Sequence, residues 1–173
     1  MGRSNAYWNS NLYTVEGVEP LPTAPLTDLS PTLASRFNVV RSGLLALEGV
    51  AELVRFMGPM WRWAWEYGIG NRKLCWLHLM RGSVDVTFTL TDNDESRLFK
   101  GGKPAKALVR AIEEGQRTGP VRWCWLELED QRVVEAFLGL ARRKAEWLSE
   151  RPAPRRAPRL HGKGSAGGGS QAD

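Results

Sequence analysis

The segments WRWAWEY (residues 61–67), KLCWLHLM (73–80) and VDVTFTLT (84–91) decide the fold. In the first, aromatic side chains occupy every second position, and in the third, apolar and polar side chains alternate. Successive side chains of a β-strand point to opposite faces, so a period of two predicts strands. The middle segment is apolar on both faces, which predicts a central strand. Because short glycine-containing turns join the three segments, they predict an antiparallel meander.

The segments outside the meander complete a predicted fold of class α+β. Leucine and valine at spacings of three and four predict an amphipathic helix over residues 44–57. The polar residues 92–103 predict a loop, and Pro104 then begins a short helix. Residues 121–128 are predicted to form a fourth strand, and Asp130 is the expected N-cap of a final helix. The prediction is an antiparallel four-stranded sheet with helices on one face, in the order α-β-β-β-α-β-α.

Composition shifts predict three regions along the chain. Residues 1–35 are rich in proline, which predicts an arm without regular helix, docked through Tyr7, Trp8 and Tyr13. Residues 36–149 form the compact domain. Residues 150–173 are predicted to be a disordered basic tail, because they are rich in Pro, Arg and Gly and carry only one anchoring leucine. This tail holds most of the basic excess in a chain of net charge +5.

The composition also excludes several classes of protein. Hydrophobic residues make up 42% of the chain and charged residues 25%, as in ordinary globular proteins. No apolar run reaches the length of a membrane span, and no secretory signal begins the sequence, so we expect a cytoplasmic protein. Two cysteines and two histidines without zinc-binding spacing predict no metal, and no cofactor is expected. Cys75 and Cys124 are expected to be reduced core residues, with a disulfide between adjacent strands as the alternative.

Four strand segments carry a resemblance to a known family. They are WAWEY (63–67), LCWL (74–77), the valine-rich strand 84–90 and RWCWLEL (122–128). Together they resemble the bacterial family called domain of unknown function 3788, over about residues 43–148. The resemblance implies a small cytosolic protein and a fold, but no activity. The sequence departs from the pattern where the glycine expected before the late Arg-Trp pair is displaced to Gly119.

The eight tryptophans are the strongest functional signal in the sequence, and two interpretations stay open. Large indoles stabilise a core by their burial, so the tryptophans on the predicted strands could be core alone. Rigid rings are also hard to pack without gaps, so the same core could enclose a ligand pocket. For the second interpretation, we predict ligand binding by Trp63, Trp65, Tyr67, Trp76, His78, Trp123, Trp125 and Glu127.

Two polar residues among these rings allow a chemical role. If His78 and Glu127 face one cavity, they could fix a cationic or polar ligand, or act as acid and base. The alternative is that His78 is a hydrogen-bonded core residue and Glu127 reaches solvent. Glu66 is expected on the opposite face, in a solvated cross-strand ion pair with Arg62 and Arg122.

These observations predict a small-molecule-binding domain, with two further hypotheses. The sequence has no G-x-S-x-G, Walker or H-E-x-x-H motif, which favours binding over catalysis. One alternative is association with nucleic acid or a ribonucleoprotein through the basic tail and arginines of the sheet. The other is an enzyme of unknown reaction that uses His78 and Glu127. The stretch Lys100-Gly101-Gly102-Lys103 is interpreted as a mobile loop, with a phosphate cradle as its alternative.

Overall fold

The computed structural model describes residues 4–150, which form six helices and one six-stranded sheet. The strands are β1 (Val50–Phe56), β2 (Trp63–Ile69), β3 (Arg72–Leu79), β4 (Val84–Thr91), β5 (Gln116–Thr118) and β6 (Val121–Glu127). The helices are α1 (Asn5–Asn9), α2 (Pro25–Asp28), α3 (Pro31–Leu45), α4 (Asp92–Lys100), α5 (Lys106–Glu113) and α6 (Gln131–Glu150). The predicted α+β class and antiparallel sheet are therefore confirmed.

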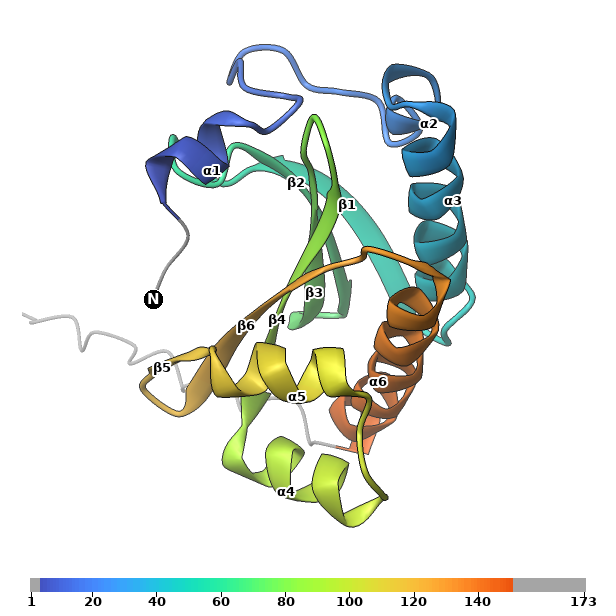
Figure 1. Cartoon of the computed structure of the whole chain (residues 1–173), viewed down its shortest axis with the longest axis vertical. Coiled ribbons are helices and arrows are strands. Elements are labelled where there is room, and N and C mark those ends of the chain that lie inside the picture. Colours follow the sequence, from blue (N-terminus) through green and yellow to red (C-terminus); the bar gives the residue numbers. More distant parts are fainter. Residues whose placement is uncertain (1–3, 151–173) are drawn as a thin grey trace, which may run out of the picture.

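The sheet has the strand order β1-β2-β3-β4-β6-β5, with every neighbouring pair antiparallel. The expected meander is present as β2, β3 and β4, and β6 pairs with β4 after the chain has passed through α4 and α5 (Figure 1). The prediction of four strands and of the order α-β-β-β-α-β-α is wrong, because β1 and β5 add one strand at each edge.

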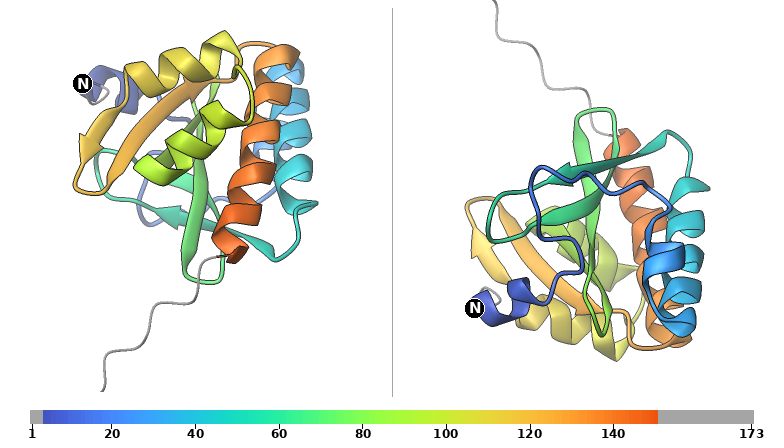
Figure 2. Two further views of the ribbon diagram at one scale, coloured as in Figure 1. Left: turned by 90° about the horizontal axis from the view of Figure 1, so that it is seen from below. Right: turned by 90° about the horizontal axis from the view of Figure 1, so that it is seen from above.

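One face of the sheet forms the main core together with α3 and α6. These two helices lie side by side across the strands (Figure 1, Figure 2). Because successive side chains of a strand point to opposite faces, every second side chain of each strand lies on this helix-covered face. It carries Trp65, Leu77, Val86 and Leu126, one in each of the strands β2, β3, β4 and β6 and in register with one another. All four are buried.

The segment predicted as a helix over residues 44–57 is divided between two elements. Its first residues end α3, and the chain then turns at Gly49, which has a φ of 72°, into β1. The sequence of β1 does not alternate regularly between apolar and polar residues, because Glu52 lies at a position that faces the core. Its carboxylate accepts three hydrogen bonds from Arg41 and one from the Tyr67 hydroxyl at 2.7 Å. A paired carboxylate thus replaces the apolar residue that a strand pattern requires.

The polar residues 92–103, expected as a loop, contain α4 instead. Thr91 caps this helix: its hydroxyl accepts from the Asp94 amide, and the Asp94 carboxylate accepts from the Thr91 amide. This reciprocal pair is a capping box. Acidic residues in the first turn and basic residues in the last complement the helix dipole. Local polar interactions therefore form a helix that has few apolar residues to bury.

Prolines begin helices in the N-terminal region, where none was expected. Pro25 and Pro31 occupy the first turns of α2 and α3, where a missing amide donor costs no hydrogen bond. The predicted domain boundary at residue 36 falls inside α3. The segment between α1 and α2 passes over the strands in Figure 2 (right).

The N-terminal region is docked on both faces of the sheet. Val15 and Pro22 accept hydrogen bonds from the indoles of Trp63 and Trp65, at 2.8 and 2.9 Å, on the helix-covered face. Trp8 is only 2% exposed and packs against His78 on the opposite face. Trp8 and Leu29 of this region are thus buried in the domain, whereas Val15, Val18 and Leu21 are exposed.

A β-bulge bends the start of β3. The register of β2 and β3 shifts between Tyr67 and Gly68, and Leu74 and Cys75 both enter the core cluster as a result. A Cβ atom on Gly68 would lie 2.6 Å from the backbone oxygen of Arg72. Only glycine fits the bulge without moving the backbone.

We expect the substitution Gly68→Ala to lower the free energy of unfolding by about 1–3 kcal/mol, because the added methyl overlaps backbone. The matched control is Gly139→Ala in α6, where the Cβ would meet nothing within 4 Å. That change should raise stability by up to about 1 kcal/mol, since alanine is the better helix former. Urea unfolding of the three proteins measures both effects. Equal stability of the two variants would contradict the assigned role of the bulge.

Candidate functional site

The structure divides the eight predicted ligand-binding residues between the two faces of the sheet. Trp63, Trp65 and Tyr67 belong to the helix-covered core. The side chains of Trp76, His78, Trp123, Trp125 and Glu127 lie on the second face, as their register positions across β3, β4 and β6 show. The eight residues therefore do not line one common cavity.

The aromatic side chains on the helix-covered face form solid core. Trp65 and Tyr67 are fully buried, and Trp63 is 6% exposed. Phe37 packs edge-on against Trp65, and Tyr13 covers it from the N-terminal region. Burial raises the pKa of Tyr67, and the neighbouring Glu52 carboxylate adds to this shift. Trp63, Trp65 and Tyr67 are therefore core residues.

On the second face, five rings form a cluster that we call the indole cluster. Its members are Trp8, Trp61, Trp76, Trp123 and His78, and neighbouring ring centroids lie 5.0–6.0 Å apart. Trp61 was expected on the same face as Trp63. It lies opposite because Arg62, with a φ of 60°, interrupts the strand alternation before β2 begins.

His78 lies beneath the indoles of Trp8 and Trp61 and is fully buried. Its Nε2 atom is 2.8 Å from the Thr87 hydroxyl, and its Nδ1 atom has no hydrogen-bond partner within residues 4–150. Burial lowers its pKa to about 3. His78 therefore stays a neutral core residue at physiological pH.

His78 and Glu127 occupy one row across the sheet, with Asp85 of β4 between them. Asp85 is buried and accepts a hydrogen bond from the Tyr7 hydroxyl. Glu127 is exposed, whereas His78 is closed off by Trp8 and Trp61. Two strand spacings separate the backbones of His78 and Glu127 by about 10 Å. The two side chains therefore have separate environments, and no cavity among the described pockets contains both.

Trp125 and Glu127 line a hollow of about 180 Å³ against α5. Its walls carry Arg110 and Glu114, which form an ion pair at 2.8 Å. The Trp125 Nε1 atom is buried and has no hydrogen-bond partner within the described chain. This hollow is small and strongly polar.

A larger pocket of about 420 Å³ opens beside the indole cluster, and we call it the Trp76–Lys144 pocket. It contains two of the eight predicted residues, Trp76 and Trp123, whose rings stack at 5.4 Å with an angle of 26° between their planes. Its lining residues are Arg72, Lys73, Trp76, Thr89, Thr91, Asp94, Val121, Trp123, Lys144 and Leu148. This volume falls within the range of small-molecule sites.

The pocket forms where β3 and β4 separate. Their ladder runs from Leu79↔Val84 to Cys75↔Phe88 and goes no further, although β4 continues to pair with β6 as far as Thr91. The bulge between Tyr67 and Gly68 lies directly beside this point. The strand ends left apart contribute Arg72, Lys73, Thr89 and Thr91 to the lining.

Lys144 of α6 reaches into the gap between the separated strands. Its ammonium donates to the Leu74 carbonyl at 2.6 Å and lies 3.5 Å from the Thr89 hydroxyl. It thus satisfies a backbone acceptor at the point where the ladder stops. The residue is only 3% exposed, so the pocket contains a deeply buried lysine.

The floor of the pocket is fixed by a charged group on the second face. The buried Glu66 carboxylate accepts from Lys73 and from the Trp76 indole at 2.9 Å, and Arg55 lies 3.6 Å away. Burial alone would raise the pKa of Glu66. The hydrogen bonds from Lys73 and Trp76, with attraction to both cations, nevertheless hold the pKa below its usual range.

These contacts correct the expected solvated pair of Glu66 with Arg62 and Arg122. Glu66 is 3% exposed, and its partners are Lys73, Arg55 and Trp76. Arg122 binds Glu95 instead.

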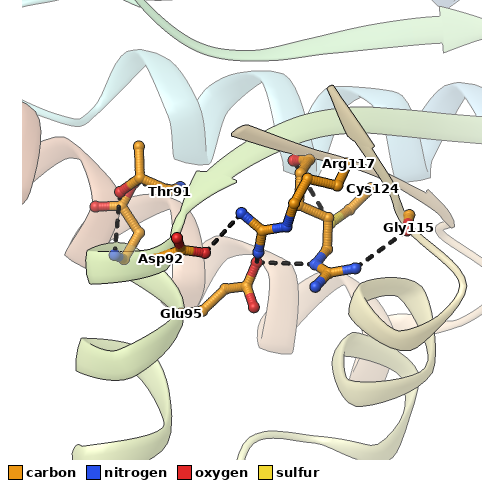
Figure 3. A network of polar contacts seen from close by, with 8 residues as sticks. Thr91, Asp92, Glu95, Gly115, Arg117 and Cys124 are labelled. Atoms are coloured by element: carbon orange, nitrogen blue, oxygen red, sulfur yellow. Dashed lines mark hydrogen bonds and ion pairs between the residues drawn. The ribbon is translucent and has the colours of Figure 1, made fainter. Parts of the chain in front are cut away.

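A second network holds α4 and the β5–β6 hairpin together at the rim of the pocket (Figure 3). Glu95 of α4 accepts from Arg117 at 3.2 Å and from Arg122 at 2.8 Å, and Arg122 also donates to the Gly115 carbonyl. Arg117 forms a further ion pair with Asp92. Because Thr91 and Asp94 belong to the adjoining cap of α4, this network fixes one wall of the pocket.

Lys144 was missed by the sequence reasoning, although a signal was available. It lies between Ala141 and Leu148 at spacings of three and four, on the buried stripe of α6. A lysine at a core position is rare unless the site gives it a partner or a role. The predicted N-cap of this helix is confirmed, since the Asp130 carboxylate accepts from the Val133 amide at 2.9 Å.

Residues 4–150 contain no cluster of three His, Cys, Asp or Glu side chains that could hold a metal. Cys75 and Cys124 are free and buried, with Phe88 paired between them in the sheet, and burial raises the pKa of each thiol to about 12. None of the helices in this range has the length and apolar character needed to cross a bilayer.

The neutral state of His78 predicts a dependence of stability on pH. Its folded pKa of about 3 lies below that of the unfolded chain, so only the unfolded state binds a proton as the pH falls below about 6.5. We expect His78 to remove about 2 kcal/mol of stability between pH 7 and pH 5. His78→Gln should lack this contribution, so the difference in unfolding free energy between the two proteins should change with pH. A constant difference would show that the folded protein also protonates His78, beside the Asp85 carboxylate.

Comparisons with known proteins identify no relative of this chain. No protein-family model matches the chain, and neither the curated proteins nor the solved structures contain a match. The resemblance over residues 43–148 therefore stays a prediction, and the site has to be interpreted from its own chemistry.

Proposed function

We propose that this protein binds a small molecule in the Trp76–Lys144 pocket. The observation that carries the proposal is the gap between β3 and β4, which has stacked indoles on one side and a buried lysine on the other. Binding sites typically combine apolar walls with a few fixed polar groups. Here Trp76 and Trp123 supply the wall, and Lys144 supplies a polar group held by two hydrogen bonds.

The rigidity of the surroundings supports this proposal. Trp76 is held through its indole by Glu66, and the opposite rim is held by the network around Glu95. A site whose walls are fixed before binding loses less conformational entropy when a ligand enters. The pocket thus has the properties of a preformed site.

The two alternative functions have less support. The acid–base pair of His78 and Glu127 would need a shared cavity, and His78 is covered by Trp8 and Trp61. The basic tail lies outside the described residues. Of the sheet arginines named in the sequence analysis, Arg62 donates to Asn9 and Arg122 is engaged with Glu95.

Matched substitutions on β6 test the proposal. Trp123 lines the pocket, whereas Trp125 lies on the same strand and the same face but outside the pocket. A metabolite panel screened by thermal shift and tryptophan fluorescence should give at least one hit on the unmodified protein. Trp123→Ala should weaken this hit about tenfold or more, because a lost aromatic contact surface costs about 1–3 kcal/mol.

The control variant Trp125→Ala should bind the same compound with nearly unchanged affinity. Equal loss of binding in both variants would place the ligand elsewhere or report a general loss of structure. Thermal unfolding of each variant distinguishes these two results. A panel without any hit would overturn the proposal.

A further inference from the structure

We propose that a second pocket, between α1 and the loop that joins β1 to β2, binds the oxyanion group of a small molecule, a carboxylate or a phosphate. The pocket has a volume of about 270 Å³, and we call it the Arg62 pocket. It shares no lining residue with the Trp76–Lys144 pocket. Figure 1 shows α1 beside this loop. Three features carry the inference: the charge of the lining, the unused donors of Arg62 and the backbone that holds this arginine.

The lining of the Arg62 pocket contains one cation and no carboxylate. The lining residues are Asn5, Trp8, Asn9, Pro59, Met60 and Arg62. Within residues 4–150, the Arg62 guanidinium forms no ion pair. A partly buried cation is screened by water less than a fully exposed one, so it attracts an opposite charge more strongly. The charge of the lining therefore favours an anion.

The guanidinium of Arg62 has more hydrogen-bond donors than the described chain uses. Its Nη2 atom donates to the Asn9 side-chain oxygen at 3.3 Å, and its Nε atom is buried without a partner. A guanidinium carries several N–H donors in one plane, and their spacing matches the oxygens of a carboxylate or a phosphate. The carboxamides of Asn5 and Asn9, one turn apart on α1, add further donors to the same lining. An oxyanion supplies the acceptors that these donors need.

The backbone of Arg62 is held in a conformation that arginine rarely adopts. Its φ of 60° lies in the left-handed region, which favours glycine and asparagine. The Arg62 amide donates to the Gly58 carbonyl at 2.8 Å. On either side of Arg62, the carbonyls of Trp61 and Trp63 accept from the buried side chain of Asn11. Backbone hydrogen bonds thus fix this conformation without help from the arginine side chain.

The fold therefore gives no reason for an arginine at this position. Glycine or asparagine would adopt the same backbone at lower cost, and the arginine side chain adds one hydrogen bond among residues 4–150. A strained backbone that carries unused donors points to a binding role. A polynucleotide would need several cations along its path, and this lining has one. The oxyanion thus belongs to a small molecule, and the exposed side chains of Pro59 and Met60 supply apolar contact for its organic part.

A series of compounds with the same alkyl chain tests the class of ligand. Butanoate, butyl phosphate, butan-1-ol and butylammonium differ only in the head group. NMR titration of the full chain should show that an acid shifts the side-chain N–H signals of Arg62, Asn5 and Asn9. At least one acid should bind about 10- to 100-fold tighter than the alcohol, as expected for hydrogen bonds to a charged group. The tighter of the two acids identifies the ligand as a carboxylate or a phosphate, and butylammonium should leave these signals unmoved.

A substitution in the loop tests the assigned partner. Arg62→Asn removes the charge and keeps a residue that tolerates the left-handed backbone, so it should abolish the preference for the acid without lowering the Tm. Arg81→Gln is the matched control. Arg81 is an exposed cation beside α1, where its amide donates to the Ser10 carbonyl at 2.9 Å, and it lies outside the lining. This variant loses the same charge and should keep the preference.

Several results would overturn this inference. They are equal binding of the acids and the alcohol, a preference for the acid that persists in Arg62→Asn, and an equal loss of preference in both variants, which would reflect net charge alone. A lower Tm of Arg62→Asn would show that the fold itself needs the arginine. Acid binding in the Trp76–Lys144 pocket would instead shift the indole N–H signals of Trp76 and Trp123. Failure of the Arg62 pocket is therefore distinguishable from failure of the proposed function.

Discussion

The separation of β3 from β4 is the constraint on which the rest of this structure depends. The two central strands pair for only part of their length, and the bulge at Gly68 lies beside the point where they part. Backbone groups at such a point need new partners, and Lys144 of α6 supplies one for the Leu74 carbonyl. The same separation produces the pocket. On the second face, Trp8 and Trp61 cover the other end of β3, so the hollow remains at one end only.

The strands with regular alternation could be predicted from the sequence, and the elements that depend on polar contacts could not. The strands β2 and β4 follow a period of two that is visible in their residues, and β3 and β6 contain the short apolar runs that are typical of central strands. The period in β1 is hidden by Glu52, which is acceptable inside only because Arg41 and Tyr67 bind it. The helix α4 depends on the capping pair of Thr91 and Asp94, a short pattern within a polar segment. In both cases, specific hydrogen bonds replaced the apolar pattern that sequence reasoning follows.

The candidate site was only partly accessible to the same reasoning. Aromatic residues on the predicted strands drew attention to Trp76 and Trp123, which do line the pocket. Alternation alone could not assign the correct face to Trp61, because the positive φ of Arg62 changes the face between two neighbouring tryptophans. Nor could it place Lys144, since the lysine reaches the site from a helix 70 residues after its hydrogen-bond acceptor. Sequence patterns report local geometry, and this pocket is assembled from distant segments.

The dependence of the central strands on α6 has a consequence for the order in which the domain is completed during translation. The N-terminal region and all the strands precede residues 131–150 in the chain, so any sheet that forms before α6 lacks the side chain that bridges β3 and β4. In such a sheet the Leu74 carbonyl is without its lysine donor, and α3 covers the apolar face without its neighbour α6. The last helix therefore completes both the pairing of the central strands and the cover of the core.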